Sequence, residues 1–384
     1  MDEDATGSVK RRRRREAPGG RPGTMHIAEV ASLAGVSIAT VSRALANPER
    51  VNAATRERVL EVVRRTGYTP NVAGRSLRAA RSMMVLIVIP TFITPFFNDL
   101  LLGVDRALSA QGYGLLISNL FADADKERRL VELVLAGQAD GVLLLHGKVP
   151  RGATVTLADA GVPMVAVGVP VAGRDIPAVL VQDRAGGAAV ARHLLALGHR
   201  RFGYVSGPEG NYSDSERWAG FAATLGEAGI DTASVHRYPG DFHVESGVAA
   251  GHAFLASTPR PTAVFAASDM MAIAFMRVLH AAGLRIPQDV SIAGFDGIEF
   301  ADYCEPPLTT IRQPREAMGR EAAELLVRLI RNEPIPPAES RLQLEVSLRP
   351  AGSTAPLTSG IARKALHDRP AVPGTQPADE LASS

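Results

Sequence analysis

A short stretch of the chain carries side chains suited to reading DNA bases. At helical spacing, Ile38, Ala39, Ser42 and Arg43 share one outward face. An arginine fork can donate two hydrogen bonds to guanine O6 and N7, and small apolar side chains can pack on thymine methyl groups. The pattern therefore predicts sequence-specific contact with a DNA major groove. The alternative is a small helical bundle that docks on another protein, with Arg43 merely solvated.

Three short helices would position this face. Residues 27–34 repeat apolar side chains at the i, i+3, i+4 and i+7 spacing of an amphipathic helix. Gly35 then permits a tight turn, and Ser37 can cap a second helix. A third helix is expected over 53–66, capped by Asn52. A helix, a short glycine-containing turn and a second helix make the helix-turn-helix arrangement.

Charge is unevenly distributed along the chain. Its 384 residues include 42 Lys and Arg against 40 Asp and Glu. Residues 1–81 carry 16 of the basic and only 8 of the acidic residues, which leaves 26 and 32 for the remainder. A head of net +8 on a body of net −6 indicates that only the head meets a polyanion.

The first 24 residues are charged and rich in Gly and Pro, so we predict a disordered basic arm there. Its run from Lys10 to Arg15 would add non-specific phosphate contacts. Alternatively the arm is dispensable, or Met25 is the true start of translation. No apolar segment follows the basic run, so it does not read as a secretory signal.

Short apolar runs alternate with amphipathic stretches after Arg81. This alternation predicts an α/β body of parallel sheets with right-handed crossovers. The expected strands include Val85–Ile89, Tyr113–Ser118, Gly141–Leu145, Met164–Val167, Phe202–Val205, Thr262–Ala267 and Val290–Ala293. The expected helices include Asn98–Gln111, Lys126–Ala136, Ala185–Leu197, Glu216–Ala228 and Met270–Ala282. Two sheets fit this pattern, and a cleft between two lobes is a natural ligand site at the carboxyl ends of their strands.

The run GVSIATVSRALANPERVNAATRERVLEVVRRTGYTPNVAGRSLR resembles the DNA-binding head of LacI/GalR-family transcriptional regulators almost end to end. The resemblance implies that Arg50 also contacts DNA and that residues 71–78 form a hinge helix that orders on the operator. In it Leu77 would wedge into the central minor groove of a pseudo-palindromic site. The predicted DNA-binding residues are Ser37, Ile38, Ala39, Thr40, Ser42, Arg43, Arg50, Arg75, Leu77 and Arg78.

One residue of the hinge departs from the family pattern. Gly74 stands where the family usually has Ala, and glycine costs a helix about 1 kcal/mol. We therefore expect more of the hinge's ordering to be coupled to DNA binding.

The body is similar to that of the same family, which resembles periplasmic sugar-binding proteins. On this resemblance, Phe96 and Phe97 (in TPFFNDLLLGVD) occupy the place of an aromatic over the ligand. Arg217 (in SERWAGF) matches a ligand-clamping arginine, whose fork suits hydroxyl pairs or a carboxylate. Phe242 (in GDFHVESG) matches a stacking aromatic. Phe96 has an alternative interpretation as a core residue.

Polar candidates complete the expected effector site. Asp269 (in SDMMA) and Asp296 (in AGFDG) follow strands and are candidates to accept hydrogen bonds from ligand hydroxyls. Ser213 and Asn211 are further candidates on the loop before the arginine. Asp269 has the alternative of capping a helix, and Asp183 is open between capping a helix and bordering the cleft.

Two departures bear on the ligand. Thr91 and Gly168 stand where many members of the family have acidic residues, so the first-lobe wall should be more apolar than in many sugar binders. We expect a sugar or a sugar-derived catabolite as effector, with a nucleoside second.

The resemblance also implies where the chain divides. We expect three crossings between the lobes, near Asp183, 306–310 and 326–330. The lobes would then comprise 82–183 with 308–325, and 184–307 with 326–354. The expected parts are a disordered arm (1–24), the helix-turn-helix domain (25–69), the hinge helix and linker (70–81), the effector-binding and dimerisation body (82–354) and a disordered tail (355–384). The tail shows no leucine heptads, which favours a homodimer over a tetramer.

The sequence also excludes several classes. It shows no nucleophile elbow, phosphate-binding loop or His-Glu metal spacing, so we predict no enzyme, cofactor or metal. Cys304 is the only cysteine, which indicates a reducing compartment. No apolar run is long enough to span a bilayer, and we predict a cytoplasmic protein. Two alternatives remain: a periplasmic-type solute-binding protein, and a DNA-binding regulator with no small-molecule effector.

Overall fold

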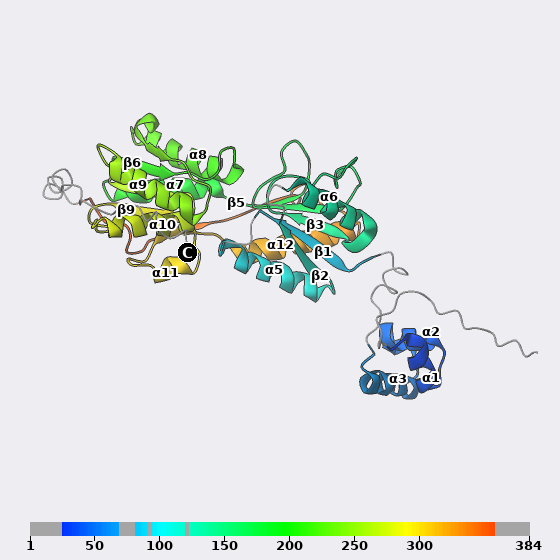
Figure 1. The fold of residues 1–384 in the computed structure, drawn as a ribbon. Helices are drawn as coiled ribbons and strands as arrows, with labels where there is room; N and C mark the ends of the chain where they lie inside the picture. The colour runs from blue at the N-terminus through cyan, green and yellow to red at the C-terminus, as the bar shows by residue number, and fades with distance from the viewer. Residues whose placement is uncertain (1–24, 69–80, 91–93, 120–122, 358–384) are drawn as a thin grey trace, which may run out of the picture. The chain divides into compact units, whose positions relative to one another are not determined.

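The computed structural model describes residues 25–68, 81–90, 94–119 and 123–357. These fall into two compact units, a head that ends by Ala79 and a body that begins at Ala80. The expected arm, most of the hinge and linker, and the tail from residue 358 lie outside the described residues. The two units are described separately (Figure 1).

The head is a cluster of three helices: α1 (Ile27–Ala34), α2 (Ile38–Ala46) and α3 (Ala53–Thr66), with a single 3₁₀ turn at Pro48–Arg50. Their core consists of Val30, Ala31, Ala34, Val41, Ala44, Val59, Val62 and Tyr68. The helix ends follow the sequence signals. Glu29 accepts from the backbone N–H of His26 at 2.7 Å, and Ser37 accepts from that of Thr40 at 3.1 Å. Gly35 ends α1 in the left-handed region, at φ 65°.

The first lobe of the body is built on six parallel strands in the order β11-β5-β4-β3-β1-β2. Their bounds are β1 (Met84–Ile89), β2 (Gly114–Asn119), β3 (Gly141–Leu144), β4 (Met164–Val167), β5 (Ala178–Val181) and β11 (Arg341–Leu344). Side chains of β1 alternate between two cores. One core lies under α5 (Phe96–Ala110) and α12 (Arg315–Ile330), the other under α6 (Ala124–Leu133), which continues into a π-helical turn at Val134–Gln138. The sheet is therefore covered on both faces, as parallel sheets require.

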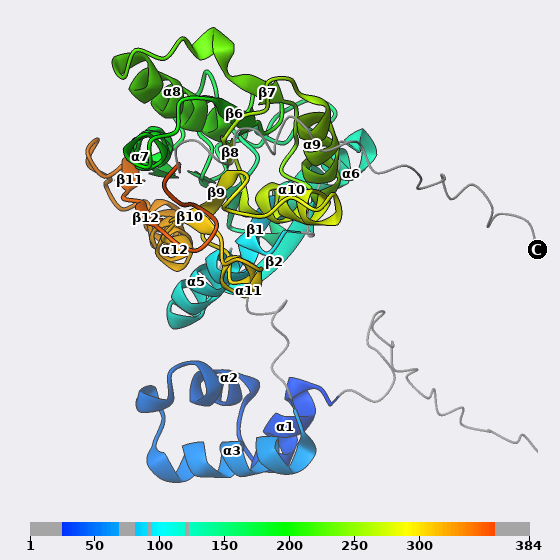
Figure 2. The ribbon, with the colours of Figure 1, turned by 90° about the vertical axis from the view of Figure 1, so that its left-hand side faces the viewer.

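The second lobe repeats this plan with one antiparallel edge strand. Its order is β12-β10-β9-β8-β6-β7, and only β12 is antiparallel to its neighbour. The strands are β6 (Phe202–Val205), β7 (His236–Tyr238), β8 (Ala263–Ala266), β9 (Ser291–Asp296), β10 (Thr309–Arg312) and β12 (Ser347–Arg349). The helices are α7 (Asp183–Ala196), α8 (Tyr212–Glu227), α9 (Val244–Ala256), α10 (Asp269–Ala281) and α11 (Phe300–Tyr303), with a short turn at Thr232–Ser234. Figure 2 shows α7 beside α8 and α9 beside α10.

The expected lobe boundaries were wrong at the second and third crossings. β10 belongs to the second sheet, so the second crossing lies after Arg312 and not at 306–310. α12 runs unbroken through Leu326 and Ile330, whose side chains are buried in the first lobe's core. The third crossing therefore lies after β11, which pairs with β5 of the first sheet.

The tail was expected to be disordered from residue 355, but residues 355–357 pack on the second lobe. The backbone N–H of Leu357 donates to the Leu197 carbonyl at 2.8 Å, and that of Ala355 donates to Ser291 Oγ at 3.1 Å.

Within the described ranges, no single helix is long and apolar enough to cross a membrane. The pair Ile27–Ala34 and Ile38–Leu45 passes that test only when taken together across a 98° bend.

Candidate effector and DNA-binding sites

A cavity of about 320 Å³ lies between the two lobes of the body. It opens at the carboxyl ends of strands from both sheets, where ligands of open α/β folds bind. The first lobe lines it with Pro90, Thr94, Phe96, Phe97, Leu100, Leu145, His146, Val167, Gly168, Val169, Val181 and Met318. The second lobe and the crossing after β10 contribute Pro208, Asn211, Ser213, Arg217, Asp241, Phe242, His243, Ser268, Met270, Asp296, Ile298 and Gln313.

Arg217 is the central charge of the cavity. Its Nε donates to Asp183 Oδ1 at 2.8 Å, and its Nη1 donates to the Ala267 carbonyl at 2.6 Å and lies 3.6 Å from Asp296 Oδ1. The guanidinium carbon lies 3.8 Å from the centroid of the Phe295 ring. Burial raises the pKa of Asp183 against the opposing effect of Arg217. Two carboxylates and a ring face thus fix the arginine in place before any ligand arrives.

Glycines bring the helices that carry this ion pair unusually close together. A Cβ on Gly187 of α7 would lie 2.0 Å from the Arg217 carbonyl oxygen, and a Cβ on Gly220 of α8 would lie 1.8 Å from that of Arg184. Asp183 begins α7 and Arg217 lies one turn into α8. The close packing of α7 on α8 therefore sets the 2.8 Å contact between them.

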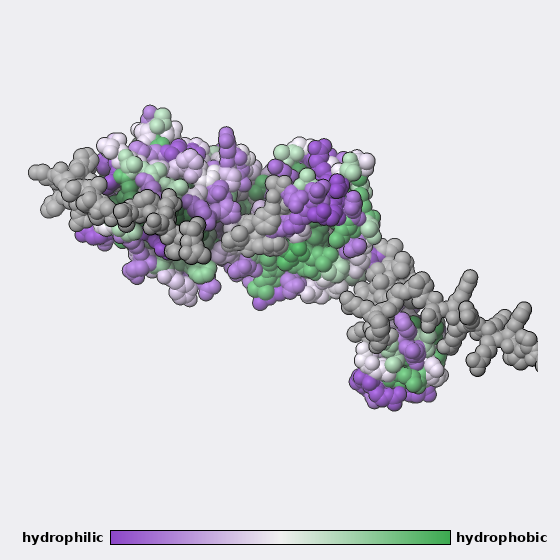
Figure 3. Space-filling view, in the orientation of Figure 1, coloured by the Kyte–Doolittle hydropathy of each residue, from purple (hydrophilic) through white to green (hydrophobic). Residues whose placement is uncertain are grey.

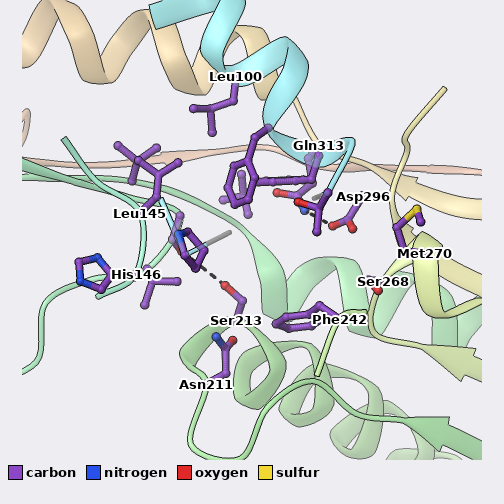
Figure 4. Close-up of a pocket in the computed structure, with 18 of the residues that line it drawn as sticks. Leu100, Leu145, His146, Asn211, Ser213, Phe242, Ser268, Met270, Asp296 and Gln313 are labelled. Carbon is purple, nitrogen blue, oxygen red and sulfur yellow. Dashed lines mark hydrogen bonds between the residues drawn. The ribbon is translucent and has the colours of Figure 1, made fainter. Parts of the chain in front are cut away.

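Asp296 ends β9 with its backbone in a strained region, at φ 124°. Gln313 Nε2 donates to its Oδ1 at 2.8 Å, as Figure 4 shows. Burial raises the pKa of Asp296 to about 6, although Arg217 and Arg315 oppose the shift. One guanidinium nitrogen of Arg315 donates to the Asp296 carbonyl and another to Asp99 of the first lobe. Asp296 is thus placed by groups from both lobes.

Aromatic rings line both sides of the cavity. Phe96 and Phe97 begin α5 and meet edge to face, with centroids 5.3 Å apart. On the other lobe, Phe242 adopts a left-handed backbone, at φ 71°. Its ring lies over Gly207, where a Cβ would come within 2.3 Å of it. Phe96 and Phe97 also pack on the first lobe's core, so they serve both as core residues and as cavity wall.

The structure leaves Asp269 outside the cavity, against expectation. Its carboxylate is fully buried, accepts hydrogen bonds from Thr310 Oγ1 and the Ile298 N–H, and so holds β10 against the start of α10. Burial and the charge of Asp296 raise its pKa to about 8. The capping alternative was also wrong, since Ser268 is the residue that caps α10.

Ser213 and Asn211 lie near each other in the second-lobe wall of the cavity (Figure 4). Ser213 Oγ reaches the Gly168 carbonyl of the opposite lobe at 3.5 Å. Asn211 caps α8 by accepting from the Asp214 N–H at 3.1 Å. Ser213 therefore touches both lobes, whereas the Asn211 side chain is partly committed to its helix.

Sequence reasoning missed Thr94, His146 and Gln313. Thr94 Oγ1 and His146 Nδ1 are buried without a hydrogen-bond partner. Burial lowers the pKa of His146, which favours its neutral form. His146 comes two residues after β3, so the rule that singled out Asp296, a polar residue following a strand, was sufficient to find it.

The predicted base-reading face is exposed on the head. Ser37, Ile38, Ala39 and Arg43 are exposed, while Thr40 and Ser42 are partly covered. Ile38 is an apolar side chain with 48% of its surface open to solvent. Arg50 is also exposed, 4.0 Å from Glu49. Arg75, Leu77 and Arg78 lie outside the described residues.

The described residues show no group of three or more His, Cys, Asp or Glu side chains placed to hold a metal ion.

Comparison with known proteins gives matches to both units. Residues 26–71 match the family model "Bacterial regulatory proteins, lacI family", and residues 191–354 match a "Periplasmic binding protein-like domain". The HTH-type transcriptional repressor CytR of Escherichia coli K12 is 34% identical over 329 residues, which cover 86% of this chain and 96% of CytR.

Two solved structures are also similar. One, titled a transcriptional regulator CelR–cellobiose complex, has a TM-score of 0.65 at 37% identity and covers 86% of this chain and 99% of its own. The lac repressor dimer bound to operator and the anti-inducer ONPF has a TM-score of 0.75 at 26% identity, with the same two coverages.

Proposed function

Because this chain belongs to the lacI family of bacterial regulatory proteins, we propose that it is a transcriptional repressor whose operator binding is controlled by a small molecule in the inter-lobe cavity. The observation that carries the proposal is Arg217, fixed between Asp183 and Asp296 in the lining of a cavity that both lobes form. The same chain carries the exposed face of α2. The family and the fold class expected from the sequence are both confirmed.

The effector is proposed to be a sugar or a sugar-derived catabolite, with a nucleoside second. Carboxylates, an arginine, two serines and two amides on one wall suit hydroxyl groups. Aromatic rings on both sides suit the apolar faces of sugar or base rings. The relative bound to cellobiose shows a sugar on a similar body.

The DNA site is proposed to be a pseudo-palindromic operator bound by a homodimer. Each α2 would enter a major groove, with Arg43 on base edges and Arg50 also in contact with the DNA. Arg75 and Arg78 would lie near phosphates, and Leu77 would open the central minor groove. A ligand that binds the DNA-competent and incompetent states unequally then shifts operator affinity.

A patch on the first lobe supports the homodimer. Figure 3 shows apolar side chains gathered over α5 and β2, where Leu102 and Ile117 are 42% and 44% exposed. β2 is the edge of its sheet, and exposed edges and apolar patches are places where chains associate. We place the protein in the cytoplasm, where a repressor meets DNA.

Of the two alternatives, the match of the head to the lacI family model removes the periplasmic-type solute-binding protein. A regulator without an effector would be expected to fill its cleft with side chains. The 320 Å³ cavity argues for the effector-controlled version.

The test begins with operator sequences selected from random DNA by the purified protein. Gel-shift titrations of the selected operator should show an affinity that changes when sugars or nucleosides are added. Leu77→Ala should weaken operator binding and reduce the bend. Unchanged affinity and bend in that variant would contradict the hinge mechanism, and an operator affinity indifferent to every candidate would contradict effector control.

A further inference from the structure

The two walls of the cavity differ in chemistry. The first-lobe wall is almost wholly apolar, with Leu100, Leu145, Val167 and Val169 among its residues. Among the described residues of that lobe, only Thr94 and His146 bring a polar side-chain atom to it. Such a wall gains from contact with an apolar group and offers little to a hydroxylated one.

The second-lobe wall is polar, but its arginine is already paired with carboxylates. Arg217 is the one Arg or Lys among the described lining residues, and it faces Asp183 and Asp296. Arg315 lies behind Asp296 and pairs with Asp99. Asp241 adds a further carboxylate to the lining. A phosphate or carboxylate entering here would meet more negative than positive charge and would lose its hydration, a combination that strongly disfavours anions.

From these two walls we infer that the effector is an uncharged molecule of two parts, a hydroxylated ring on the second-lobe wall joined to a flat, mainly apolar ring on the first-lobe wall. The inference rests on the proposed function, which it narrows. Aryl glycosides and nucleosides both have this chemistry. Free monosaccharides lack the second ring, and sugar phosphates and sugar acids carry the excluded charge.

Two unpartnered atoms refine the flat part. Thr94 Oγ1 and His146 Nδ1 are buried with no hydrogen-bond partner in the protein, and such atoms normally find one. Figure 4 places His146 at one end of the cavity, beyond Leu145 and opposite Asp296 and Met270. A flat ring with one or two polar edge atoms, as in a nitrophenyl group or a nucleobase, supplies those partners while its faces stay apolar.

The test uses two matched triplets on the full-length protein, read by isothermal titration calorimetry. One is a p-nitrophenyl glucoside, the methyl glucoside and the p-nitrophenyl glucuronide. The other is uridine, methyl riboside and uridine 5′-monophosphate. In at least one triplet the neutral two-part member should bind at least about tenfold more tightly than both relatives, equivalent to about 1.4 kcal/mol. The triplet whose neutral member binds shows whether the effector is an aryl glycoside or a nucleoside.

Three results would overturn the assignment. They are a methyl glycoside binding as tightly as its two-part relative, an anionic member binding more tightly than the neutral one, and no binding in either triplet.

A variant pair tests the apolar wall itself. Val169→Thr keeps the side-chain shape but places a hydroxyl on the first-lobe wall, so the preference for the two-part ligand over its methyl relative should fall several-fold. Val155→Thr makes the same change at an exposed residue that does not line the cavity, and the preference should be unchanged. Equal effects of the two substitutions would contradict the two-wall assignment.

Gel shifts separate this inference from the proposed function. If the two-part ligand binds as expected and leaves operator affinity unchanged, effector control fails while the ligand assignment stands. If a free sugar or a sugar phosphate changes operator affinity and the two-part ligands do not bind, the ligand assignment fails while effector control stands.

Discussion

Replacing Gly220 by alanine tests whether the close packing of α7 on α8 positions Arg217. The new Cβ would lie 1.8 Å from the Arg184 carbonyl oxygen, 2.8 Å from the Arg184 carbonyl carbon and 3.0 Å from the Ala188 nitrogen. All three atoms belong to the backbone of α7, so no side chain can rotate away. The helices themselves must move apart.

The size of the effect follows from these distances. Relieving the 1.8 Å contact to a tolerable 3.0 Å needs a displacement of 1.2 Å. A similar displacement between Arg217 Nε and Asp183 Oδ1, now 2.8 Å apart, leaves them near 4 Å and breaks the hydrogen bond. Overpacking of this kind costs about 1–3 kcal/mol. For a body of this size each kcal/mol lowers Tm by about 2–4 °C.

The chain contains its own reporter and control for this experiment. Trp218 is the only tryptophan, adjoins Arg217 on α8, and packs 4.0 Å from the Arg237 guanidinium carbon. Its emission should shift in Gly220→Ala, and effector binding should weaken. Gly226→Ala changes the same helix where a Cβ meets nothing within 4 Å, so about 0.4–1 kcal/mol of stabilisation is expected. If the two variants melt alike and both keep the native emission, the packing argument is refuted.

Three further predictions concern other parts of the molecule. In gel-shift titrations, Arg43→Ala should abolish the protein's preference for the selected operator over random DNA. An equal weakening of binding to both DNAs would contradict base readout by Arg43. A double-mutant cycle of Arg315→Met with Asp99→Asn, measured by urea unfolding, should give a coupling of no more than about 1 kcal/mol because Asp99 is half exposed; a larger value would contradict the weak coupling expected of a half-exposed ion pair. Burial lowers the pKa of His199 in the folded body. Below about pH 6.5 the unfolded chain therefore binds more protons than the folded body does. The free energy of unfolding that His199 contributes above that pH is then lost on acidification. His199→Gln should flatten the fall in Tm between pH 7 and pH 5, and an unchanged slope would rule out His199 as its source.

The head and the central strands were predictable because their signals are local. His26, Ser37 and Asn52 lie at the expected helix starts, and the side chains of Ser37 and Asn52 accept backbone hydrogen bonds there. β4 and β6 have the predicted bounds, since each is an apolar run buried on both faces. The strand β11 was not predicted, because it lies at a sheet edge and its sequence is Arg-Leu-Gln-Leu, with half its residues exposed. Because this strand was not predicted, the third crossing between the lobes was placed too early in the chain.

The site was less predictable, because two aspartates with the same local pattern have different roles. Asp269 and Asp296 each lie near the carboxyl end of a neighbouring strand. Asp269 is the first residue of α10, and its carboxylate points toward β10. Asp296 has a φ of 124°, precedes Gly297 and lines the cavity. The difference depends on the pairing of β9 with β10 and on the partners Thr310 and Gln313, more than a dozen residues away. No short motif contains that information.

Ser213 and Arg315 join the lobes beside the cavity, and this bears on how a ligand would act. Ser213 reaches Gly168 at 3.5 Å, the outer limit of a hydrogen bond, and Arg315 of α12 donates to the Asp296 carbonyl of the second lobe. Converting a 99:1 preference between two lobe angles into its reverse takes about 5.5 kcal/mol of differential binding. A ligand that hydrogen-bonds Arg217, Asp296 and Ser213 while burying a ring on the first-lobe wall gains from both lobes only at the angle where both reach it. Because such a ligand adds contacts to both lobes at one angle, we expect the effector to determine the lobe angle. X-ray scattering profiles that are identical with and without a bound effector would contradict this.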